Sequence, residues 1–308
     1  DGQANPSDIT QALAKGARMA GVSIFEDTEV TDLDIDNGRI KAVITDRGRI
    51  ECEKVVVCAG QWTRAFAGRF GVNVPLVSVQ HQYVITEAFG VPSSLPTLRD
   101  PDRPTYYKEE VGGLVMGGYE PNPVGWAENG IPADFHYTLL DSDFDHFEPI
   151  MELALGRVPK LETTGIKQLL NGPESFTPDG NFILGEAPEL RNFFVGAGFN
   201  AFGIASGGGA GMALAEWAAK GEAPYDLWPV DIRRFGRPHF DTDWVRTRTY
   251  EAYGKHYTMA WPFEEHSSGR PARKSPPTRA RHRVDRRLHH RLPRSALMET
   301  GDKAPGGQ

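Results

Sequence analysis

The segment FFVGAGFNAFGIASGGGAGMALAEWAAKG, from Phe193 to Gly221, constrains the fold of this chain more than any other stretch. It reads as an apolar strand, a glycine-rich turn and a helix, and Gly196, Gly198 and Ala201 match the pattern G-x-G-x-x-[GA]. This order is typical of layered α/β domains in which a helix N-terminus faces a ligand. The match raises the hypothesis that the turn holds a dinucleotide.

The sequence after the helix argues against a pyrophosphate site at this turn. A dinucleotide-binding unit needs a second parallel strand, with an acidic residue about 20 residues further on. After Gly221 the chain reads EAPYDLWPVDIRRFG, with two prolines and no apolar strand. Two other roles stay open. Gly198 and Gly203 could let the backbone approach another part of a ligand, at a helix that begins near Ser206. Alternatively, the glycines from Gly207 to Gly211 could permit close packing of that helix on a sheet.

The first part of the chain predicts a helix followed by an antiparallel meander. Apolar residues at helical spacing begin after the Ser7 and Asp8 start signal and stop at Gly21. The β-branched runs that follow are separated by Asn37-Gly38 and by Arg47-Gly48, which are typical of hairpin turns.

The run KVVVCAG differs because it is apolar without alternation. Such a run predicts a strand that is buried on both faces of a layered sheet. Cys52 and Cys58 are then expected in buried strands, and two cysteines are too few for a disulfide framework, which favours a reducing compartment. A helix is expected next, from about Trp62 to Phe70.

The middle of the chain predicts a separate, mostly antiparallel sheet. The segments PLVSVQHQYVITEAF and RPTYYKEEVGGLVMGGYEP alternate, as at Val77, Val79 and His81. The segment SDFDHFEPIMELALGRVP predicts an amphipathic helix. Its expected apolar side consists of Phe144, Phe147, Ile150, Met151 and Leu153. The chain therefore leaves one domain and returns to it.

Charge divides the chain unevenly. The formal net charge is −7, but from Pro271 onward there are 10 Lys and Arg against 3 Asp and Glu. A basic nucleic-acid tail is one interpretation, and a disordered or out-of-frame terminus is the favoured one, because the segment has no aromatic residue for base stacking. His282, His289 and His290 lack the Cys or carboxylate spacing of a metal site, so no metal is predicted. The sequence contains no run of about 18 apolar residues, so no membrane-spanning helix is predicted.

Six segments together resemble flavin-dependent amine oxidoreductases of the D-amino-acid-oxidase-like superfamily, most of all the dimethylglycine and sarcosine dehydrogenase/oxidase group. They are TEVTDL, KVVVCAGQWT, PLVSVQHQYVITE, LRDPDRPTYYKEEVGGLVMGGYEP, NGPESFTPDGNFILGEAPELRNFFVGAGFNAFGIASGGGAG and HYTMAWPFEE. Their order and spacing over most of residues 1–271 make the resemblance specific, whereas any one segment alone is weak.

The resemblance implies a fold of class α/β plus α+β, an FAD-binding domain with an inserted, mostly antiparallel substrate domain. In this family the glycine-rich unit that holds the FAD pyrophosphate lies upstream of where this sequence begins, so an incomplete FAD-binding domain is expected. The expected limits are 1–75 for its first part, 76–164 for the substrate domain, 165–225 for its returning part, 226–270 for the start of a central domain or linker, and 271–308 for a disordered basic tail.

The resemblance also implies the site residues. His81 of the HQY motif and Tyr106 of the YY motif are the expected catalytic residues at the substrate face of the flavin. From the residues alone, His81 could equally be a core residue, and only one of Tyr106 and Tyr107 can face its side of a sheet. Lys108 could attract a substrate carboxylate, although a solvated strand lysine is the favoured interpretation. The expected cofactor-binding residues are Val30, Ala59, Gly60, Trp62, Pro178, Asp179, Gly198, Phe199, Gly203 and Ile204.

The expected function is oxidation of the C–N bond of a secondary or tertiary amine, such as sarcosine or dimethylglycine, by hydride transfer to FAD. The imine would hydrolyse to formaldehyde or, in full-length relatives, pass its carbon to tetrahydrofolate. The alternatives are a flavin oxidase of another amine or amino acid, and a non-catalytic fragment or subunit that needs a partner chain to hold FAD. A small-molecule amine is the expected partner, without nucleic acid or membrane, in the cytoplasm or, in a eukaryote, the mitochondrial matrix.

Overall fold

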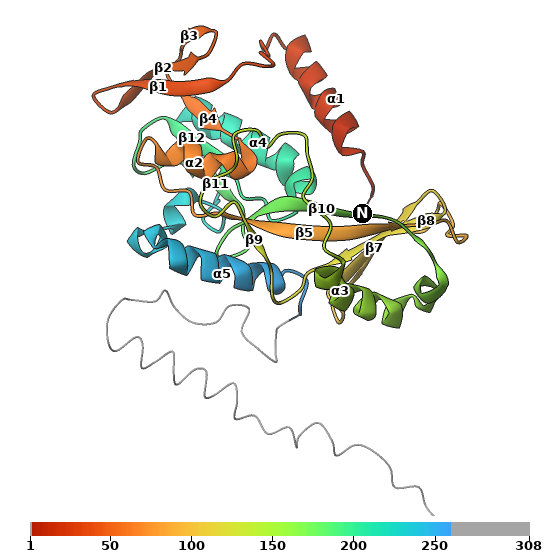
Figure 1. The fold of residues 1–308 in the computed structure, drawn as a ribbon. Coiled ribbons are helices and arrows are strands. Elements are labelled where there is room, and N and C mark those ends of the chain that lie inside the picture. Colours follow the sequence, from red (N-terminus) through yellow and green to blue (C-terminus); the bar gives the residue numbers. More distant parts are fainter. Residues whose placement is uncertain (1, 260–308) are drawn as a thin grey trace, which may run out of the picture. The chain divides into compact units, whose positions relative to one another are not determined.

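The computed structural model describes residues 2–259, whose fold Figure 1 shows. The chain divides into two units, Asp1–Ser267 and Ser268–Gln308, and the first contains every described residue. The basic segment 271–308 and its three histidines lie outside the described residues. The α-helices are α1 (Pro6–Met19), α2 (Thr63–Gly68), α3 (Phe144–Arg157), α4 (Gly203–Lys220) and α5 (Thr242–Gly254). Within residues 2–259, none of the helices has the length and apolar character needed to cross a membrane.

The strands belong to three sheets. They are β1 (Val30–Asp36), β2 (Arg39–Thr45), β3 (Gly48–Glu51), β4 (Val55–Val57), β5 (Val77–Thr86), β6 (Leu98–Asp100), β7 (Thr105–Glu110), β8 (Gly113–Gly118), β9 (Gly125–Trp126), β10 (Ile166–Phe176), β11 (Ile183–Glu186) and β12 (Phe193–Ala197). Short 3-10 helices are η1 (Gly60–Trp62), η2 (Pro159–Thr163), η3 (Ile232–Arg234) and η4 (Arg237–Phe240).

The N-terminal helix and meander form as predicted. The side chain of Asn5 caps α1, because its Oδ1 accepts hydrogen bonds from the backbone N–H groups of Ser7 and Asp8 at 2.9 and 3.1 Å. The capping residue is therefore Asn5 rather than Ser7 or Asp8. Strands β1, β2 and β3 pair antiparallel in this order. Asn37 and Gly38 both have positive φ, 49° and 71°, as a tight type I′ hairpin turn requires.

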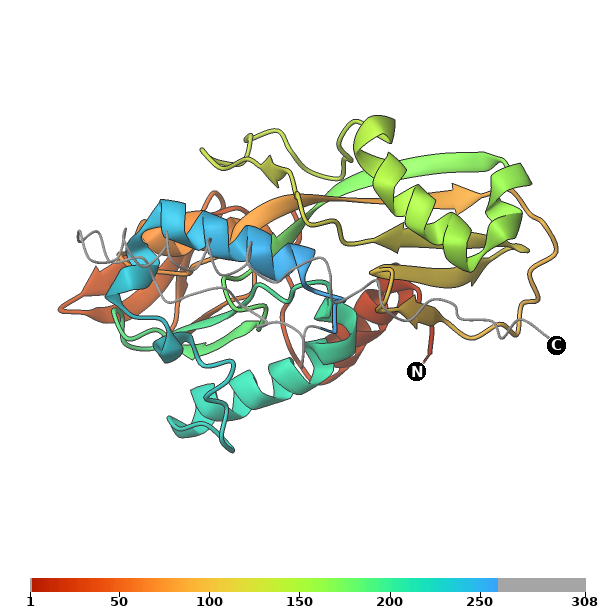
Figure 2. The ribbon, with the colours of Figure 1, turned by 90° about the horizontal axis from the view of Figure 1, so that it is seen from below.

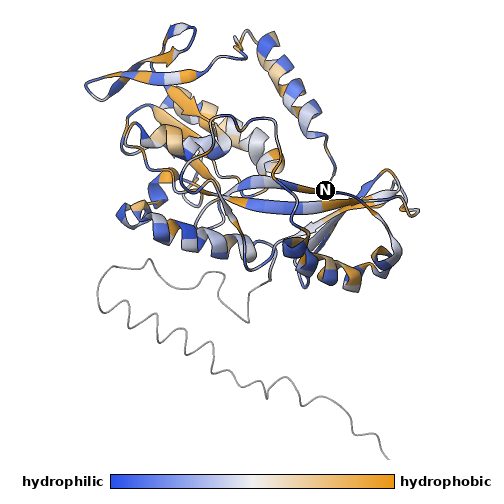
Figure 3. Ribbon diagram, viewed as in Figure 1, coloured by the Kyte–Doolittle hydropathy of each residue, from blue (hydrophilic) through white to orange (hydrophobic). Residues whose placement is uncertain are grey.

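A small mixed sheet, in the order β11-β12-β4, carries α4. Strands β12 and β4 run parallel, and β11 is antiparallel to β12. Leu214 and Trp217 of α4 pack on Leu184 and Phe194 of this sheet. In Figure 3 these strands are among the most hydrophobic parts of the ribbon, whereas α5 is mostly hydrophilic.

The prediction that KVVVCAG is buried on both faces is wrong. Val56 is 45% exposed, because β4 is a three-residue strand at the edge of its sheet. Cys52 is half-buried and Cys58 is exposed, and neither lies in a strand. An apolar run identifies a strand, but it does not tell whether that strand lies at the centre or at the edge of the sheet.

The middle of the chain forms the predicted antiparallel sheet, in the order β10-β5-β8-β7-β6 with β9 on β5. Strands β5 and β10 pair along their whole length, from Val77 opposite Phe176 to Thr86 opposite Ile166. Helix α3 packs against β7 and β8 (Figure 2). Strand β10 belongs to this sheet although the sequence assigned it to the returning FAD-binding part, and the domain limits stay a prediction.

The apolar side of α3 differs in part from the prediction. Phe147 and Ile150 are buried and Met151 is partly buried, but Phe144 is 58% and Leu153 is 42% exposed. The residues that face the sheet are Phe147, Ile150 and Ala154. They follow the i, i+3, i+7 spacing of one helix face, and Phe144 and Leu153 lie at the two margins of that face.

Helix α5 packs on the antiparallel sheet. It contacts β5 and β10, and its buried Tyr253 joins a cluster with Val79, Tyr119 and Phe176. This helix begins at the N-cap Asp241, whose side chain accepts hydrogen bonds from the backbone of the first turn. The segment after α4 thus returns to the antiparallel sheet.

Candidate functional site

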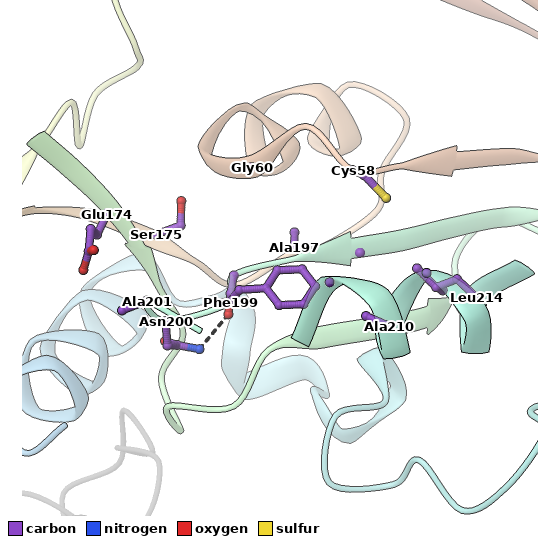
Figure 4. Close-up of a pocket in the computed structure, with 14 residues that line it drawn as sticks. Cys58, Gly60, Glu174, Ser175, Ala197, Phe199, Asn200, Ala201, Ala210 and Leu214 are labelled. Carbon is purple, nitrogen blue, oxygen red and sulfur yellow. Dashed lines mark hydrogen bonds between the residues drawn. The ribbon is translucent and has the colours of Figure 1, made fainter. Parts of the chain in front are cut away.

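The glycine-rich turn after β12 is held in an unusual conformation. Gly198, Asn200 and Ala201 all have left-handed φ values, of 64°, 48° and 67°. The buried Asn200 fixes the turn. Its Oδ1 accepts a hydrogen bond from the backbone N–H of Thr177 at 2.9 Å, and its Nδ2 donates to the carbonyl of Gly198 at 2.6 Å (Figure 4). Non-glycine residues in this region are strained, and such strain concentrates at functional sites.

The glycines of this segment serve different purposes. A Cβ on Gly196 would come within 2.8 Å of Leu214, so Gly196 permits close packing of α4 on β12. A Cβ on Gly198 would come within 2.6 Å of Thr177. By contrast, no described atom outside the adjacent residues and the nearby backbone of α4 lies within 4 Å of the Cβ position at any glycine from Gly207 to Gly211. The helical glycines therefore do not serve packing against the described part of the chain.

Helix α4 begins at Gly203, three residues earlier than predicted. No side chain caps it, and its first turn holds no acidic residue. Its N-terminus therefore offers backbone N–H groups and the positive end of the helix dipole. No strand follows α4 within residues 222–259, as predicted, which supports the argument against a pyrophosphate cradle at this turn.

A cavity of about 390 Å³ lies between β12, α4 and the loop after β4 (Figure 4). Glycine and alanine supply most of its wall, namely Gly60, Gly196, Ala197, Gly198, Ala201, Gly207, Ala210 and Gly211. Ligand pockets commonly measure roughly 300 to 1,000 Å³. A wall with so few side chains leaves room for a flat ligand close to the backbone.

Three of the expected cofactor-binding residues, Gly60, Gly198 and Phe199, line this cavity. The structure does not bring the others to its wall; they are Val30, Ala59, Trp62, Pro178, Asp179, Gly203 and Ile204. Pro178 and Asp179 lie in a turn that is closed by a hydrogen bond from the backbone N–H of Gly180 to the carbonyl of Thr177 at 3.3 Å. The carboxylate of Asp179 is engaged by Arg234, whose Nε and Nη2 donate to the two oxygens at 2.7 and 3.1 Å. The carboxylate of Asp179 thus anchors the turn to η3.

The expected catalytic residues meet in the antiparallel sheet. His81 is buried, and its Nε2 lies 3.0 Å from the hydroxyl oxygen of Tyr106. The phenol reaches His81 across Gly117 of β8, where a Cβ would lie 2.4 Å from the hydroxyl. Burial, with a smaller contribution from Glu174, raises the pKa of Tyr106 well above its usual value, so the phenol stays protonated. Tyr107 points elsewhere and bonds to Thr105, as alternation along a strand requires.

Sequence reasoning missed the groups on the other side of His81. Its Nδ1 lies 3.0 Å from the hydroxyl of Tyr253 on α5. That hydroxyl is 3.2 Å from Oε2 of Glu120, and Tyr119 stacks on the His81 ring with centroids 4.7 Å apart. Glu120 and Tyr119 follow the alternating strand β8, which is the one local signal for them. No local sequence pattern predicts that α5 packs against β5.

Arg99 was also not predicted as a site residue from the sequence. It lies opposite Tyr106 in the pairing of β6 with β7. Its guanidinium carbon is 3.8 Å from the centroid of the Tyr257 ring. No carboxylate among residues 2–259 forms an ion pair with Arg99, whereas Lys108 Nζ lies 2.8 Å from Oε2 of Glu110. Arg99, rather than Lys108, therefore offers an uncompensated positive charge beside Tyr106.

Glu174 connects the cavity with this cluster. It lines the cavity and stands opposite Val79 in the β5–β10 ladder, two residues from the position opposite His81. Its Oε2 is buried and has no hydrogen-bond partner in the described part of the chain. A buried carboxylate oxygen without a donor is costly, so a ligand N–H would satisfy it.

A glycine-lined cavity on an α/β sheet, linked through Glu174 to a His–Tyr pair on an antiparallel sheet, is the kind of site that an oxidoreductase with a flat cofactor requires. Residues 1–217 match the family of FAD dependent oxidoreductases, and the chain belongs to this family. Residues 220–275 match the FAD dependent oxidoreductase central domain. The fold class and FAD as the family's cofactor are thereby confirmed.

Three relatives show the range of this group. The chain is 41% identical over 282 residues to the mitochondrial sarcosine dehydrogenase of Mus musculus, covering 90% of this chain and 30% of that protein. It is 38% identical over 277 residues to the formaldehyde-forming 4-methylaminobutanoate oxidase of Paenarthrobacter nicotinovorans, covering 90% and 34%. It is 37% identical over 280 residues to the mitochondrial pyruvate dehydrogenase phosphatase regulatory subunit of Mus musculus, covering 90% and 32%. The chain thus spans about a third of the length of these relatives.

A solved structure agrees with the fold. L-Proline dehydrogenase from P. horikoshii superimposes with a TM-score of 0.65 at 26% identity, over 76% of this chain and 61% of that one.

The residues present fit the ring end of FAD. Gly207 and Gly211 line the cavity and leave open space where side chains would stand. The uncapped N-terminus of α4 favours negative charge nearby, such as a reduced flavin ring develops.

Proposed function

We propose that this chain carries the flavin-ring and substrate site of an enzyme that oxidises the C–N bond of an N-methylated amino acid, of the sarcosine or dimethylglycine type. The observation that carries the proposal is the contact of 3.0 Å between buried His81 and partly buried Tyr106, on the sheet whose Glu174 lines the glycine-rich cavity. Two of the relatives act, by their names, on sarcosine and on 4-methylaminobutanoate. Both compounds combine a methylated amine with a carboxylate.

The residues of the chain would prepare the amine for oxidation. Bound FAD supplies the acceptor for the hydride that leaves the carbon next to the substrate nitrogen. A protonated nitrogen cannot donate its electron pair as that C–H bond breaks, so the substrate ammonium must first lose a proton. When the Tyr106 O–H donates to His81 Nε2, a lone pair of the phenol oxygen stays free to accept the substrate N–H.

Two charged groups near this pair match the two ends of such a substrate. We assign the carboxylate to Arg99, which has no ion-pair partner among the described residues and lies across from Tyr106. We assign the incoming ammonium to Glu174, whose buried Oε2 lacks a donor in the described part of the chain. Bidentate contact with a carboxylate is the characteristic use of an arginine guanidinium.

The later steps belong to the whole protein. In the proposed reaction, water hydrolyses the imine to formaldehyde and the demethylated amine, or the carbon passes to tetrahydrofolate. The name of the mouse relative places that enzyme in mitochondria, which supports the mitochondrial matrix for this protein in a eukaryote.

The test begins with flavin binding by the purified 308-residue chain. We expect the chain to bind added FAD, and sarcosine, dimethylglycine or 4-methylaminobutanoate to bleach the flavin absorbance without oxygen. Tyr106→Phe should slow this bleaching about a hundredfold. Tyr107→Phe, which removes a buried phenol hydroxyl next in the chain, should not. Bleaching by proline or glycine but by none of the three N-methyl compounds would contradict the substrate assignment.

A second candidate function is that of a non-catalytic subunit that needs a partner chain. The 37% identity to a phosphatase regulatory subunit favours it. So do the large apolar side chains that are exposed on β4, η1 and α4, namely Val56, Trp62, Ile204 and Met212. A colourless chain that takes up no FAD alone, but does so when a second chain binds it, would support this candidate over the first.

A further inference from the structure

The hydrogen-bond chain behind His81 continues well beyond the catalytic pair. From Tyr106 it runs through His81 to the hydroxyl of Tyr253, then to Glu120, whose Oε1 lies 2.9 Å from Nε2 of His146. Glu120 is buried, with its side chain 8% exposed, while the side chain of His146 is 22% exposed. The chain of contacts thus leads from the substrate side to the edge of the protein.

Counting donors fixes the direction of these bonds. The Tyr253 hydroxyl has one proton but three neighbours, namely His81 Nδ1, Glu120 Oε2 and the carbonyl oxygen of Gln80 at 3.3 Å. The last two can only accept. If the phenol donated to His81, a buried carboxylate oxygen would be left without a donor. A bond from a phenol to a carboxylate is charge-assisted and about twice as strong as a neutral one. Tyr253 therefore donates to Glu120 and accepts from His81 Nδ1–H.

We propose that Tyr253 and Glu120 are positioning residues that hold His81 in its Nδ1–H form, so that its Nε2 is the base that receives the proton of Tyr106. This proposal rests on the proposed function. As the substrate ammonium gives its proton to the oxygen of Tyr106, the phenol proton of Tyr106 passes to His81 Nε2. The nitrogen of the substrate loses one proton and His81 gains one. The imidazolium then faces the carboxylate of Glu120 through the Tyr253 hydroxyl.

The burial of the Tyr253 hydroxyl is a second observation that supports a positioning role for this residue. Tyr253 lies on α5, in the segment that matches the FAD dependent oxidoreductase central domain, and outside residues 1–217, which match the FAD dependent oxidoreductase family. Its burial raises its pKa well above the usual value, with Glu120 adding to the shift, so it stays a neutral donor. A phenylalanine would fill the same apolar space, so packing alone does not explain the hydroxyl.

Other titratable groups surround the pair and are held constant in the test. They are Tyr106, Tyr119, His146, Glu174, His256 and Tyr257. None of them is substituted in the variants below.

The experiment measures the tautomer of His81 directly by ¹⁵N NMR of the purified chain, labelled at its nine histidines. His81→Asn identifies the signal by its loss. We expect Nδ1 to carry the proton in the wild-type chain and in the control Tyr107→Phe, and a mixture of both forms in Tyr253→Phe. Glu120→Gln keeps the size of the side chain but can donate to Tyr253, and should also weaken the Nδ1–H preference. It gives the same readout if Tyr253→Phe does not fold.

A kinetic readout separates this proposal from the proposed function. In the FAD-loaded chain, Tyr253→Phe should lower kcat about tenfold to a hundredfold and leave KM within about twofold, because the base and not the substrate contacts is changed. A proton on Nε2 in the wild-type chain, or an unchanged His81 signal in both variants, would overturn the proposal. An Nδ1–H signal that responds to both variants, in a chain that oxidises no amine, would sustain the positioning role and reject only the proposed function.

Discussion

The substitution Gly117→Ala adds a single methyl group and tests whether the phenol of Tyr106 lies over Gly117. A Cβ there would lie 2.4 Å from the hydroxyl oxygen of Tyr106 and 2.6 Å from Cζ. Carbon contacts are ordinarily about 3.5–4.0 Å, so Gly117→Ala must displace the phenol by about 1 Å. The φ of Gly117 is not positive, so alanine adds no backbone strain, and no functional group is lost.

Two effects of known size follow from this displacement. The 3.0 Å contact between Tyr106 and His81 moves out of hydrogen-bond range. A misplacement of about 1 Å in an active site costs up to about a hundredfold in rate. Forcing a methyl group into a packed site costs about 1–3 kcal/mol. In a unit of this size each kcal/mol lowers the Tm by about 2–4 °C.

The assays are thermal unfolding by circular dichroism and anaerobic flavin bleaching by sarcosine. The matched control is Gly172→Ala on β10, opposite His81, where a Cβ would meet only Leu139 at an ordinary 3.7 Å. It should unfold and react as the wild type does. In a Tyr106→Leu background, Gly117→Ala should lose most of its destabilising effect, because the ring it displaces is gone. A Gly117→Ala chain with unchanged Tm and rate would show that the phenol does not lie over this glycine.

Three further outcomes are expected. In steady-state assays, Arg99→Gln should raise the KM for sarcosine about tenfold or more, because a hydrogen bond to a charged group contributes about 1.5–3 kcal/mol. The KM for an N-methyl amine without a carboxylate should stay constant. Gly211→Ala should stabilise α4 by about 1 kcal/mol yet weaken FAD uptake in a titration, because its methyl group enters the cavity, whereas Gly209→Ala should stabilise the helix alone. Two arginines lower the pKa of the buried Asp100, Arg157 first, so this carboxylate stabilises the fold above its unfolded pKa of about 3.9 and ceases to do so as pH falls through the lowered folded pKa. In urea unfolding, Asp100→Asn should lower the free energy of unfolding more at pH 7 than at pH 3, and equal losses at both would contradict this linkage.

The sequence predicted what short-range periodicity controls. Alternation placed His81 on the inner face of β5 and required that only one of Tyr106 and Tyr107 face it, and the structure brings Tyr106 there. The meander, the antiparallel sheet and the absence of a strand after α4 are also properties of local patterns. Turn residues and strand alternation act over a few residues, so one sequence suffices to read them.

Contacts between distant segments could not be predicted in this way. Tyr253 stands 172 positions from His81, and its spacing on α5 is that of any buried helical tyrosine. Whether an apolar strand is central or at an edge depends on its neighbours in space, which is why Val56 was misjudged. The role of each glycine is equally non-local, since Gly196 meets Leu214 and Gly211 meets open space.

The long pairing of β5 with β10 determines the order in which this protein can be built. Strands β6 to β9 and helix α3 all lie between the two in the chain. Contacts between residues so far apart in sequence form slowly, because the entropy of closing a large loop is lost before the contacts can stabilise the fold. During synthesis, β5 leaves the ribosome long before β10, and one of its edges stays open to wrong partners until then. His81 lies on that strand and meets Tyr253 later still, so the newly made chain completes the His81–Tyr253 contact last.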